Sequence, residues 1–180
     1  MKKNSIVLKL AIFAFTVLFV PCSLMAQDDK DKLLKDGREA RSSFIKTDKS
    51  MSQLFNDSYG YVIFPKVGKG AVVVGGAGGN GVVYQKGKAI GTAKMAQVNV
   101  GAQVGGQTYR EVIFFENKDA LDRFKDNKLE FAGQVSATAA KSGASANAKY
   151  REGVQVFTEE IGGLMLEASI GGQKFTYKSL

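Results

Sequence analysis

The sequence predicts an α+β fold: a curved antiparallel β-sheet or barrel of short glycine-rich strands, with an N-terminal amphipathic helix and one or two further helices packed on it. Two observations lead to this prediction. Residues 28–46 place apolar and charged side chains with helical periodicity. From residue 59 onward the chain is a series of short apolar runs separated by glycines and turn residues, a pattern that favours antiparallel strands.

The first 26 residues are predicted to be a secretory signal peptide. Lysines precede an apolar run from Leu10 to Val20, and Ala26 offers a small residue for cleavage. The run is shorter than the roughly 20 apolar residues that a membrane-spanning helix needs. Residues 19–22 (FVPC) match a lipoprotein signal poorly, so lipidation of Cys22 is not expected. We therefore expect an exported protein, periplasmic or secreted, with residues 27–180 forming one domain.

Helical patterns mark three segments of that domain. In residues 28–46 the apolar side chains gather on one face and the charged side chains on the other. A short helix is expected over residues 50–55, and Asn117 is placed to cap a third over residues 118–124. The apolar face of the first helix can be buried either on the sheet or in a bilayer. The candidates for membrane contact on that face are Leu33, Leu34, Phe44 and Ile45.

Strands are expected in the remaining apolar runs. They cover residues 59–64, 70–76, 80–85, 108–116, 129–139, 154–157, 164–170 and 174–177, with two more inside 88–103. Residues 85–88 (QKGK) have the composition of a hairpin turn. The small polar residues of 141–149 predict a loop.

Residues 76–81 (GAGGNG) match the glycine pattern of dinucleotide-binding loops, but their context does not fit. Such a loop opens a helix and is followed about 20 residues later by an acid. Here residues 82–84 (VVY) are β-rich, and the next acid is Glu111. A second window, residues 157–177, repeats a Gly-Gly pair at the same place. We therefore expect these glycines to shape the sheet, through positive φ at turns and bulges or through close backbone approach. The alternative is that some of them face a ligand.

Within residues 27–180 the excess positive charge lies in one segment. Residues 58–110 contain no acid and six basic residues, whereas residues 28–57 and 111–180 are nearly balanced. A surface of one sign attracts anions such as phospholipid head groups, nucleic acid or acidic partners. The alternative is that these residues are ordinary solvated side chains on strand faces. The candidate head-group ligands are Lys66, Lys69, Lys86, Lys88, Lys94 and Arg110.

Residues 27–180 contain neither cysteine nor histidine. This excludes a disulfide, a thiol nucleophile and a Cys/His zinc site within them, and it removes the commonest general base. Carboxylate chemistry remains open in principle, but no motif surrounds any pair of the glutamates. They are Glu111, Glu116, Glu159, Glu160 and Glu167. We therefore expect a protein that is not an enzyme, with no catalytic residue, no metal and no cofactor.

Four stretches of the chain resemble the SYLF-domain family in their order and spacing. They are YGYVIFPKVGKGAVVVGGAGGNGVVY (59–84), NVGAQVGGQTYREVIFFENKDALDRF (99–124), FAGQVSATAA (131–140) and VFTEEIGGLMLEASIGGQKFTY (156–177). The preceding helical segment also fits the family. Residues 141–145 (KSGAS) depart from the Gly-Pro-x-Gly-Arg that the family often has at this place.

The resemblance implies lipid binding through basic residues and an amphipathic N-terminal helix. Eukaryotic members are described as binding phosphoinositides and actin. For an exported bacterial protein, an anionic bacterial phospholipid is the corresponding ligand. We expect non-enzymatic binding to an anionic phospholipid membrane surface, with the protein peripheral to that membrane and without nucleic acid as a partner. The alternative is a structural or scaffolding module of the cell envelope that binds another protein.

Overall fold

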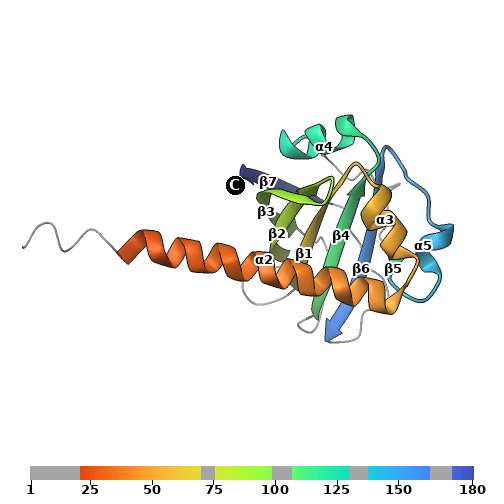
Figure 1. Cartoon of the computed structure of the whole chain (residues 1–180), viewed down its shortest axis with the longest axis horizontal. Coiled ribbons are helices and arrows are strands. Elements are labelled where there is room, and N and C mark those ends of the chain that lie inside the picture. Colours follow the sequence, from red (N-terminus) through yellow and green to blue (C-terminus); the bar gives the residue numbers. More distant parts are fainter. Residues whose placement is uncertain (1–20, 70–75, 99–106, 130–137, 163–171) are drawn as a thin grey trace, which may run out of the picture.

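The computed structural model describes residues 21–69, 76–98, 107–129, 138–162 and 172–180. The helices are α2 (Pro21–Thr47), α3 (Met51–Asp57), α4 (Lys118–Lys125) and α5 (Ala144–Asn147). The strands are β1 (Gly60–Lys69), β2 (Gly76–Gln85), β3 (Lys88–Val98), β4 (Gln107–Phe115), β5 (Thr138–Ala139), β6 (Val154–Gly162) and β7 (Gln173–Ser179). They form one sheet in the order β5-β6-β4-β1-β2-β3-β7, with α2 and α3 on one face (Figure 1). The predicted α+β class is confirmed.

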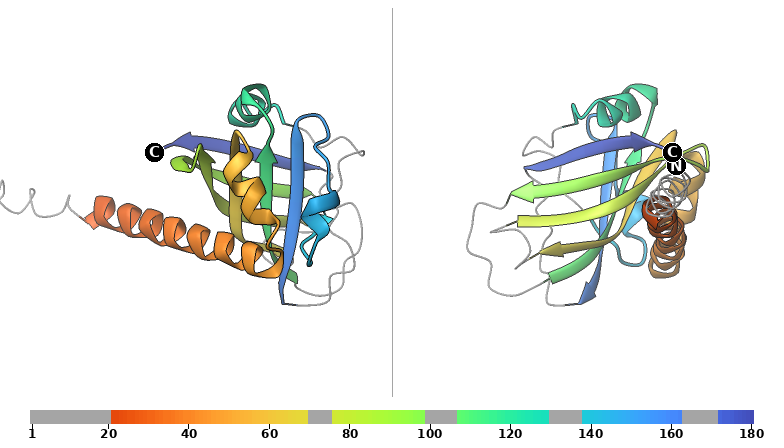
Figure 2. Two further views of the ribbon diagram at one scale, coloured as in Figure 1. Left: turned by 45° about the vertical axis from the view of Figure 1, so that its right-hand side comes forward. Right: turned by 90° about the vertical axis from the view of Figure 1, so that its left-hand side faces the viewer.

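The sheet is antiparallel throughout except for the short β5, which runs parallel to β6. It is strongly curved: β4 and β7 are separated by three strands, yet Gln173 Nε2 donates to Glu111 Oε2 at 3.0 Å. In the described part of the chain the sheet is open, with β5 and β7 at its edges (Figure 2). The predicted curvature is therefore correct and the closed alternative is wrong, because closure requires the two edge strands to pair.

The concave face of the sheet holds one hydrophobic core. Phe64, Ile113 and Phe175 face inward from three different strands and are almost fully buried. Helix α4 closes one end of this core through Phe124, whose ring centroid lies 5.1 Å from those of Phe115 and of Phe175. The predicted cap of α4 is present, since Asn117 Oδ1 accepts a hydrogen bond from the Ala120 amide at 3.0 Å.

The convex face is covered by α2 and α3, which confirms the two predicted N-terminal helices. Phe44 of α2 is fully buried there, in a cluster with Phe114 and Phe157. Phe55 of α3 makes edge contacts with Phe114 at 4.9 Å and with Tyr61 at 5.0 Å. The helix-on-sheet contact thus buries several aromatic rings. Across the described residues, no helix combines the length and the apolar character that crossing a bilayer would require.

The glycines of residues 76–81 lie inside a strand, because β2 runs without a break where a boundary was predicted. A Cβ atom on Gly79 would come 2.7 Å from the Lys66 carbonyl oxygen, and one on Gly81 would come 2.7 Å from the Phe64 ring. The β1–β2 register shifts at this place, between Ile63 and Lys66. These glycines therefore permit close backbone approach beside a bulge, which was one of the two predicted roles.

Other predicted boundaries shifted or lie outside the described residues. The hairpin turn is present, with Lys86 at φ 49° and Gly87 at φ 75°, and β3 is one strand where two were predicted within residues 88–103. The predicted loop 141–149 contains the single helical turn α5. The predicted strands 70–76, 129–139 and 164–170 fall mostly or wholly in undescribed parts of the chain.

Candidate functional site

A groove runs between the N-terminal half of α2 and the convex face of β2 and β3. Its volume is about 440 Å³. The helix contributes Asp29, Lys30, Lys32, Leu33 and Asp36, and the strands contribute Asn80, Thr92, Ala93 and Lys94. The amphipathic helix and the acid-free segment, two features that the sequence predicted separately, therefore meet at one place.

Strand register sets the lysines beside this groove. Lys66 of β1 pairs with Asn80 of β2, which pairs with Lys94 of β3. The three side chains form one row across the sheet, and strands lie about 4.8 Å apart, so the two lysines stand about 10 Å apart. Successive side chains alternate between the two faces of a strand. Since Val67 and Met95 belong to the concave core, the row faces the α2 side.

Strand β7 adds two further lysines, one on each side of the end of this row. Phe175 points into the concave core, so Lys174 and Lys178, which are exposed, lie on the convex face. Lys178 pairs with Thr92, a residue that lines the groove. We call Lys30, Lys32, Lys66, Lys94, Lys174 and Lys178 the lysine face.

The lysine face has an excess of positive charge. Only Asp29 and Asp36 among the groove residues are acidic. Within the described residues, none of the six lysines forms an ion pair. The Asn80 amide and the Thr92 hydroxyl add neutral hydrogen-bonding groups, and Leu33 adds a partly buried apolar wall. Ammonium groups beside neutral donors suit the oxygens of a phosphate or carboxylate ligand.

Two of the predicted basic residues lie at the far end of the sheet. Lys86 and Lys88 are exposed at the β2–β3 hairpin, and the Lys86 Nζ atom stands 6.0 Å from the centroid of the Tyr59 ring. Lys88 and Lys94 are six positions apart on β3, a distance of about 20 Å along an extended strand. These residues therefore do not share a site with the lysine face.

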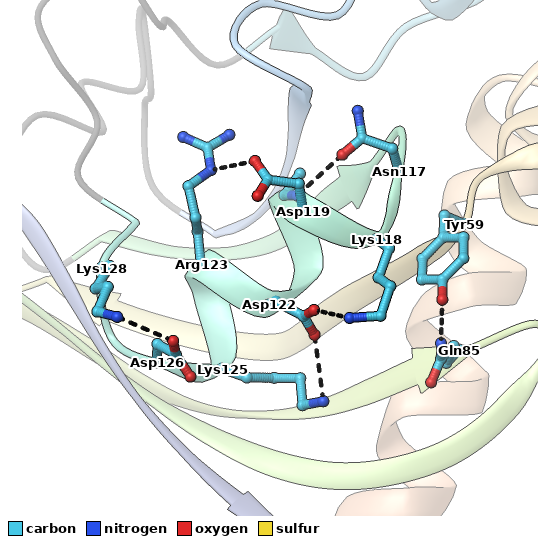
Figure 3. Close-up of polar contacts among 11 residues, drawn as sticks. Tyr59, Gln85, Asn117, Lys118, Asp119, Asp122, Arg123, Lys125, Asp126 and Lys128 are labelled. Carbon is cyan, nitrogen blue, oxygen red and sulfur yellow. Dashed lines mark hydrogen bonds and ion pairs between the residues drawn. The ribbon is translucent and has the colours of Figure 1, made fainter.

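Helix α4 lies beside this hairpin, and its cations form ion pairs with acids of their own helix (Figure 3). Asp122 pairs with both Lys118 and Lys125, and Arg123 pairs with Asp119 at 3.4 Å. The hydrogen bond from Lys118 holds the pKa of Asp122 below its usual value. The hairpin end thus gains little net charge from α4, and we regard it as the weaker candidate site.

Arg110 is engaged by a structural partner. Its Nη1 atom lies 2.9 Å from Glu159 Oε2, and Glu159 is buried. The other carboxylate oxygen of Glu159 accepts hydrogen bonds from Ser43 Oγ at 3.1 Å and Thr47 Oγ1 at 2.6 Å. Glu159 therefore fastens the C-terminal end of α2 to β4 and β6, a role that nothing in the local sequence indicates. The Lys69 side chain lies outside the described residues.

The predicted membrane-contact residues occupy two environments. Phe44 is fully buried against the sheet. Leu33, Leu34 and Ile45 are partly buried and pack against the same cluster. Helix packing therefore accounts for Phe44, while membrane contact by the other three stays a prediction.

The sequence did not single out Lys30 and Lys32 as site residues, or Lys174 and Lys178. Helical periodicity shows which residues of a helix face the sheet. It does not show which side chains at the border of that face lie close to a particular strand. The β7 lysines lie far from the acid-free segment in sequence and reach it only through the β3–β7 pairing.

The glutamates considered for catalysis are not brought together. Glu111 is fully buried on the concave side, where it accepts a hydrogen bond from Gln173 Nε2. Glu159 lies under α2 on the convex side. Glu116 and Glu160 are exposed, and Glu167 lies outside the described residues. Burial raises the pKa of the nearby Tyr109 hydroxyl, and the Glu111 carboxylate raises it further. The concave core thus contains a buried polar cluster made of Tyr109, Glu111 and Gln173.

Comparison with known proteins gives two matches. Residues 96–178 match the Ysc84 family model, described as a Las17-binding protein actin regulator. The chain is 31% identical over 126 residues to beta cell expansion factor A of Aeromonas veronii, a match that covers 70% of this chain and 48% of the relative. The chain therefore spans about half the length of this curated relative. The family-model match includes β7 but neither α2 nor the groove residues of β2 and β3.

Proposed function

The Ysc84 model represents the SYLF domain, and beta cell expansion factor A is a SYLF-family protein, so the chain belongs to the SYLF-domain family. We propose that it binds anionic phospholipid as a non-enzymatic protein at the periphery of a membrane. Membership of the family supports a lipid-binding or scaffold domain in general, and the family is generally non-catalytic. The proposal includes export, with residues 1–26 acting as the signal peptide. Beyond family membership, the proposal names where on this chain the lipid head group would bind.

The observation that carries the proposal is the lysine face beside the groove. An exposed lysine near an anionic bilayer contributes about 1 kcal/mol to binding. Four such lysines in contact would contribute about 4 kcal/mol, or roughly a thousandfold in affinity. Five of the six lysines are solvent-exposed. Because charges in water are screened beyond about 8 Å at physiological salt, this contribution should fall as ionic strength rises.

Vesicle co-sedimentation tests the proposal. The protein is mixed with vesicles of phosphatidylcholine alone or of phosphatidylcholine with phosphatidylglycerol, at low and at high salt. We expect binding to the anionic vesicles that high salt reverses, and much weaker binding to the zwitterionic ones. Equal binding to both vesicle types, insensitive to salt, would contradict the proposal.

Two matched double variants locate the site. Lys66→Gln with Lys94→Gln removes two charges from the lysine face, whereas Lys49→Gln with Lys141→Gln removes two exposed charges elsewhere. The first should weaken binding by roughly 30-fold, from about 1 kcal/mol per lysine, and the second by much less. Similar losses in both would show that net charge alone governs binding, which would refute a defined site.

A second candidate function is a scaffolding module that binds another protein. The description of the matched family model favours it, since it names a protein, Las17, as the binding partner of that family. Vesicle binding discriminates between the two functions: a protein that ignores anionic vesicles under every salt condition would leave the scaffold as the better proposal.

A further inference from the structure

Two carboxylates share the groove beside α2 with the lysines. Asp29 and Asp36 both line it, and within the part of the chain that the structure describes neither of them forms an ion pair. Acids reduce the attraction of a basic surface for an anionic bilayer, since like charges repel. A groove that served only to attract negative charge would be better without them, so their position needs a physical reason.

Asp36 lies at the inner end of the groove, where α2 meets the sheet. A Cβ atom added at the neighbouring Gly37 would lie 3.3 Å from Val82 Cγ2, so the helix rests directly on β2 at this point. Val82 pairs with Thr92, which lines the groove. Asp36 is partly buried, whereas Asp29 is exposed. Asp36 is therefore the carboxylate better placed to meet a ligand that enters the groove.

The groove presents a carboxylate and an ammonium group a short distance apart. Thr92 and Lys94 are two positions apart on β3 and lie on the same face, which separates them by about 7 Å along the strand. Asp36 borders the Thr92 end of this interval, and the Asn80 amide lies beside Lys94. A ligand that fits both ends has a negatively charged group for the lysine and, a few bonds away, a hydrogen-bond donor for the carboxylate.

We propose that the groove selects anionic phospholipids whose head group carries a free hydroxyl, as the glycerol of phosphatidylglycerol does. The phosphate accepts a hydrogen bond from Lys94 Nζ, and the head-group hydroxyl donates one to the Asp36 carboxylate. A head group that ends in an ammonium also offers a donor, but it has no net charge, whereas the lysine face has an excess of positive charge. This inference rests on the proposed lipid binding and adds the class of head group that the groove recognises.

Co-sedimentation with two lipids of equal charge tests the inference. Phosphatidylcholine vesicles contain the same fraction of either phosphatidylglycerol or phosphatidylethanol, a phosphodiester with the same charge but no head-group hydroxyl. Attraction to net charge is equal for both, so it cancels in the ratio of the two affinities. We expect roughly tenfold tighter binding to phosphatidylglycerol, the effect of one hydrogen bond to a charged group. Vesicles with phosphatidylethanolamine in its place should bind more weakly than either.

Two variants assign the selectivity to Asp36. Asp36→Ala should bring the ratio of the two affinities close to one, and it should tighten binding to phosphatidylethanol because it removes a negative charge. Asp28→Ala is the matched control: it removes the same charge from an exposed position of the same helix outside the groove, so it should preserve the ratio. Alanine favours helix formation, so both variants should fold. The comparison of the two lipids with the unaltered protein does not depend on either variant.

The outcomes separate this inference from the proposed function. Equal affinity of the unaltered protein for phosphatidylglycerol and phosphatidylethanol vesicles would overturn the inference and leave lipid binding intact. The same holds for a ratio that Asp36→Ala does not change, for a ratio that Asp28→Ala lowers equally, and for phosphatidylethanolamine vesicles that bind as tightly as phosphatidylglycerol vesicles. Binding to neither anionic lipid would refute the proposed function, and the inference with it.

Discussion

Replacing Phe44 with alanine tests whether the apolar face of α2 belongs to the sheet. Phe44 is 0% exposed and lies in the convex cluster with Phe114 and Phe157. Removal of a fully buried phenylalanine ring costs about 3–5 kcal/mol, from lost transfer energy and the cavity left behind. For a domain of 150–250 residues each kcal/mol lowers the Tm by about 2–4 °C, so we expect a fall of roughly 6–20 °C.

Urea unfolding followed by circular dichroism, without lipid, measures this cost. Ile45→Ala is the matched control, because Ile45 neighbours Phe44 on the same helix but is only partly buried, and it should cost less. If the face of α2 around Phe44 served a bilayer instead, Phe44→Ala would leave the free energy of unfolding unchanged and would weaken vesicle binding. A destabilisation below about 1 kcal/mol would refute the packing that the structure shows, since it falls far under the range for a buried ring.

Two further predictions concern stability. Gly81→Ala should destabilise the protein by about 1–3 kcal/mol, the usual cost of overpacking a core, because the new Cβ atom would lie 2.7 Å from the Phe64 ring. Gly68→Ala is the control: its Cβ atom would meet nothing within 4 Å, so it should be close to neutral. Equal urea midpoints for the two variants would contradict this reasoning. Burial raises the pKa of Asp48, but hydrogen bonds from Ser145 and Ser50 outweigh it and hold the pKa below its ordinary value. The charged form therefore stabilises the fold above the unfolded pKa of about 3.9, and this contribution is lost as pH falls through the folded pKa. Asp48→Asn should accordingly cost stability at pH 7 and progressively less below about pH 4, and a pH-independent difference in urea unfolding would count against it.

Local sequence signals were sufficient for α2, α3 and α4 and for most of the strands that the structure describes. Asn117 caps α4 because its side chain satisfies a free amide of the first turn, an interaction that involves residues only three positions apart. The turn at Lys86 and Gly87 is likewise determined by local backbone preferences. Such features depend on neighbours in the chain, so a single sequence reveals them.

The role of the strand glycines required the pairing of strands. Gly79 and Gly81 resemble turn residues when the sequence is read locally, and a strand boundary was placed there for that reason. In the fold their missing side chains make room for the Lys66 carbonyl and the Phe64 ring. Glycine is needed at these positions because of atoms on the neighbouring strand β1, and the local sequence of β2 carries no information about them.

The candidate site was only partly predictable for the same reason. A charge count along the chain identified Lys66 and Lys94, which the register places in one row. It also grouped them with Arg110, whose guanidinium is paired with Glu159 on the neighbouring strand β6, 49 positions further along the chain. Charge composition thus indicates that a basic surface exists, whereas strand pairing decides which cations share it.

The two roles considered for α2, packing on the sheet and contact with a membrane, divide along its length. Its C-terminal half is fixed by the burial of Phe44, by the hydrogen bonds to Glu159, and by Arg41, whose guanidinium lies 4.9 Å above the Phe55 ring. Its N-terminal half borders the groove with Lys30 and Lys32 and extends past the edge of the sheet (Figure 1). Deleting the whole helix would therefore remove a structural support together with the proposed lipid contact, and a loss of binding could not be assigned to either. Substitutions at Lys30 and Lys32 leave the buried half of the helix intact, so they separate binding from folding.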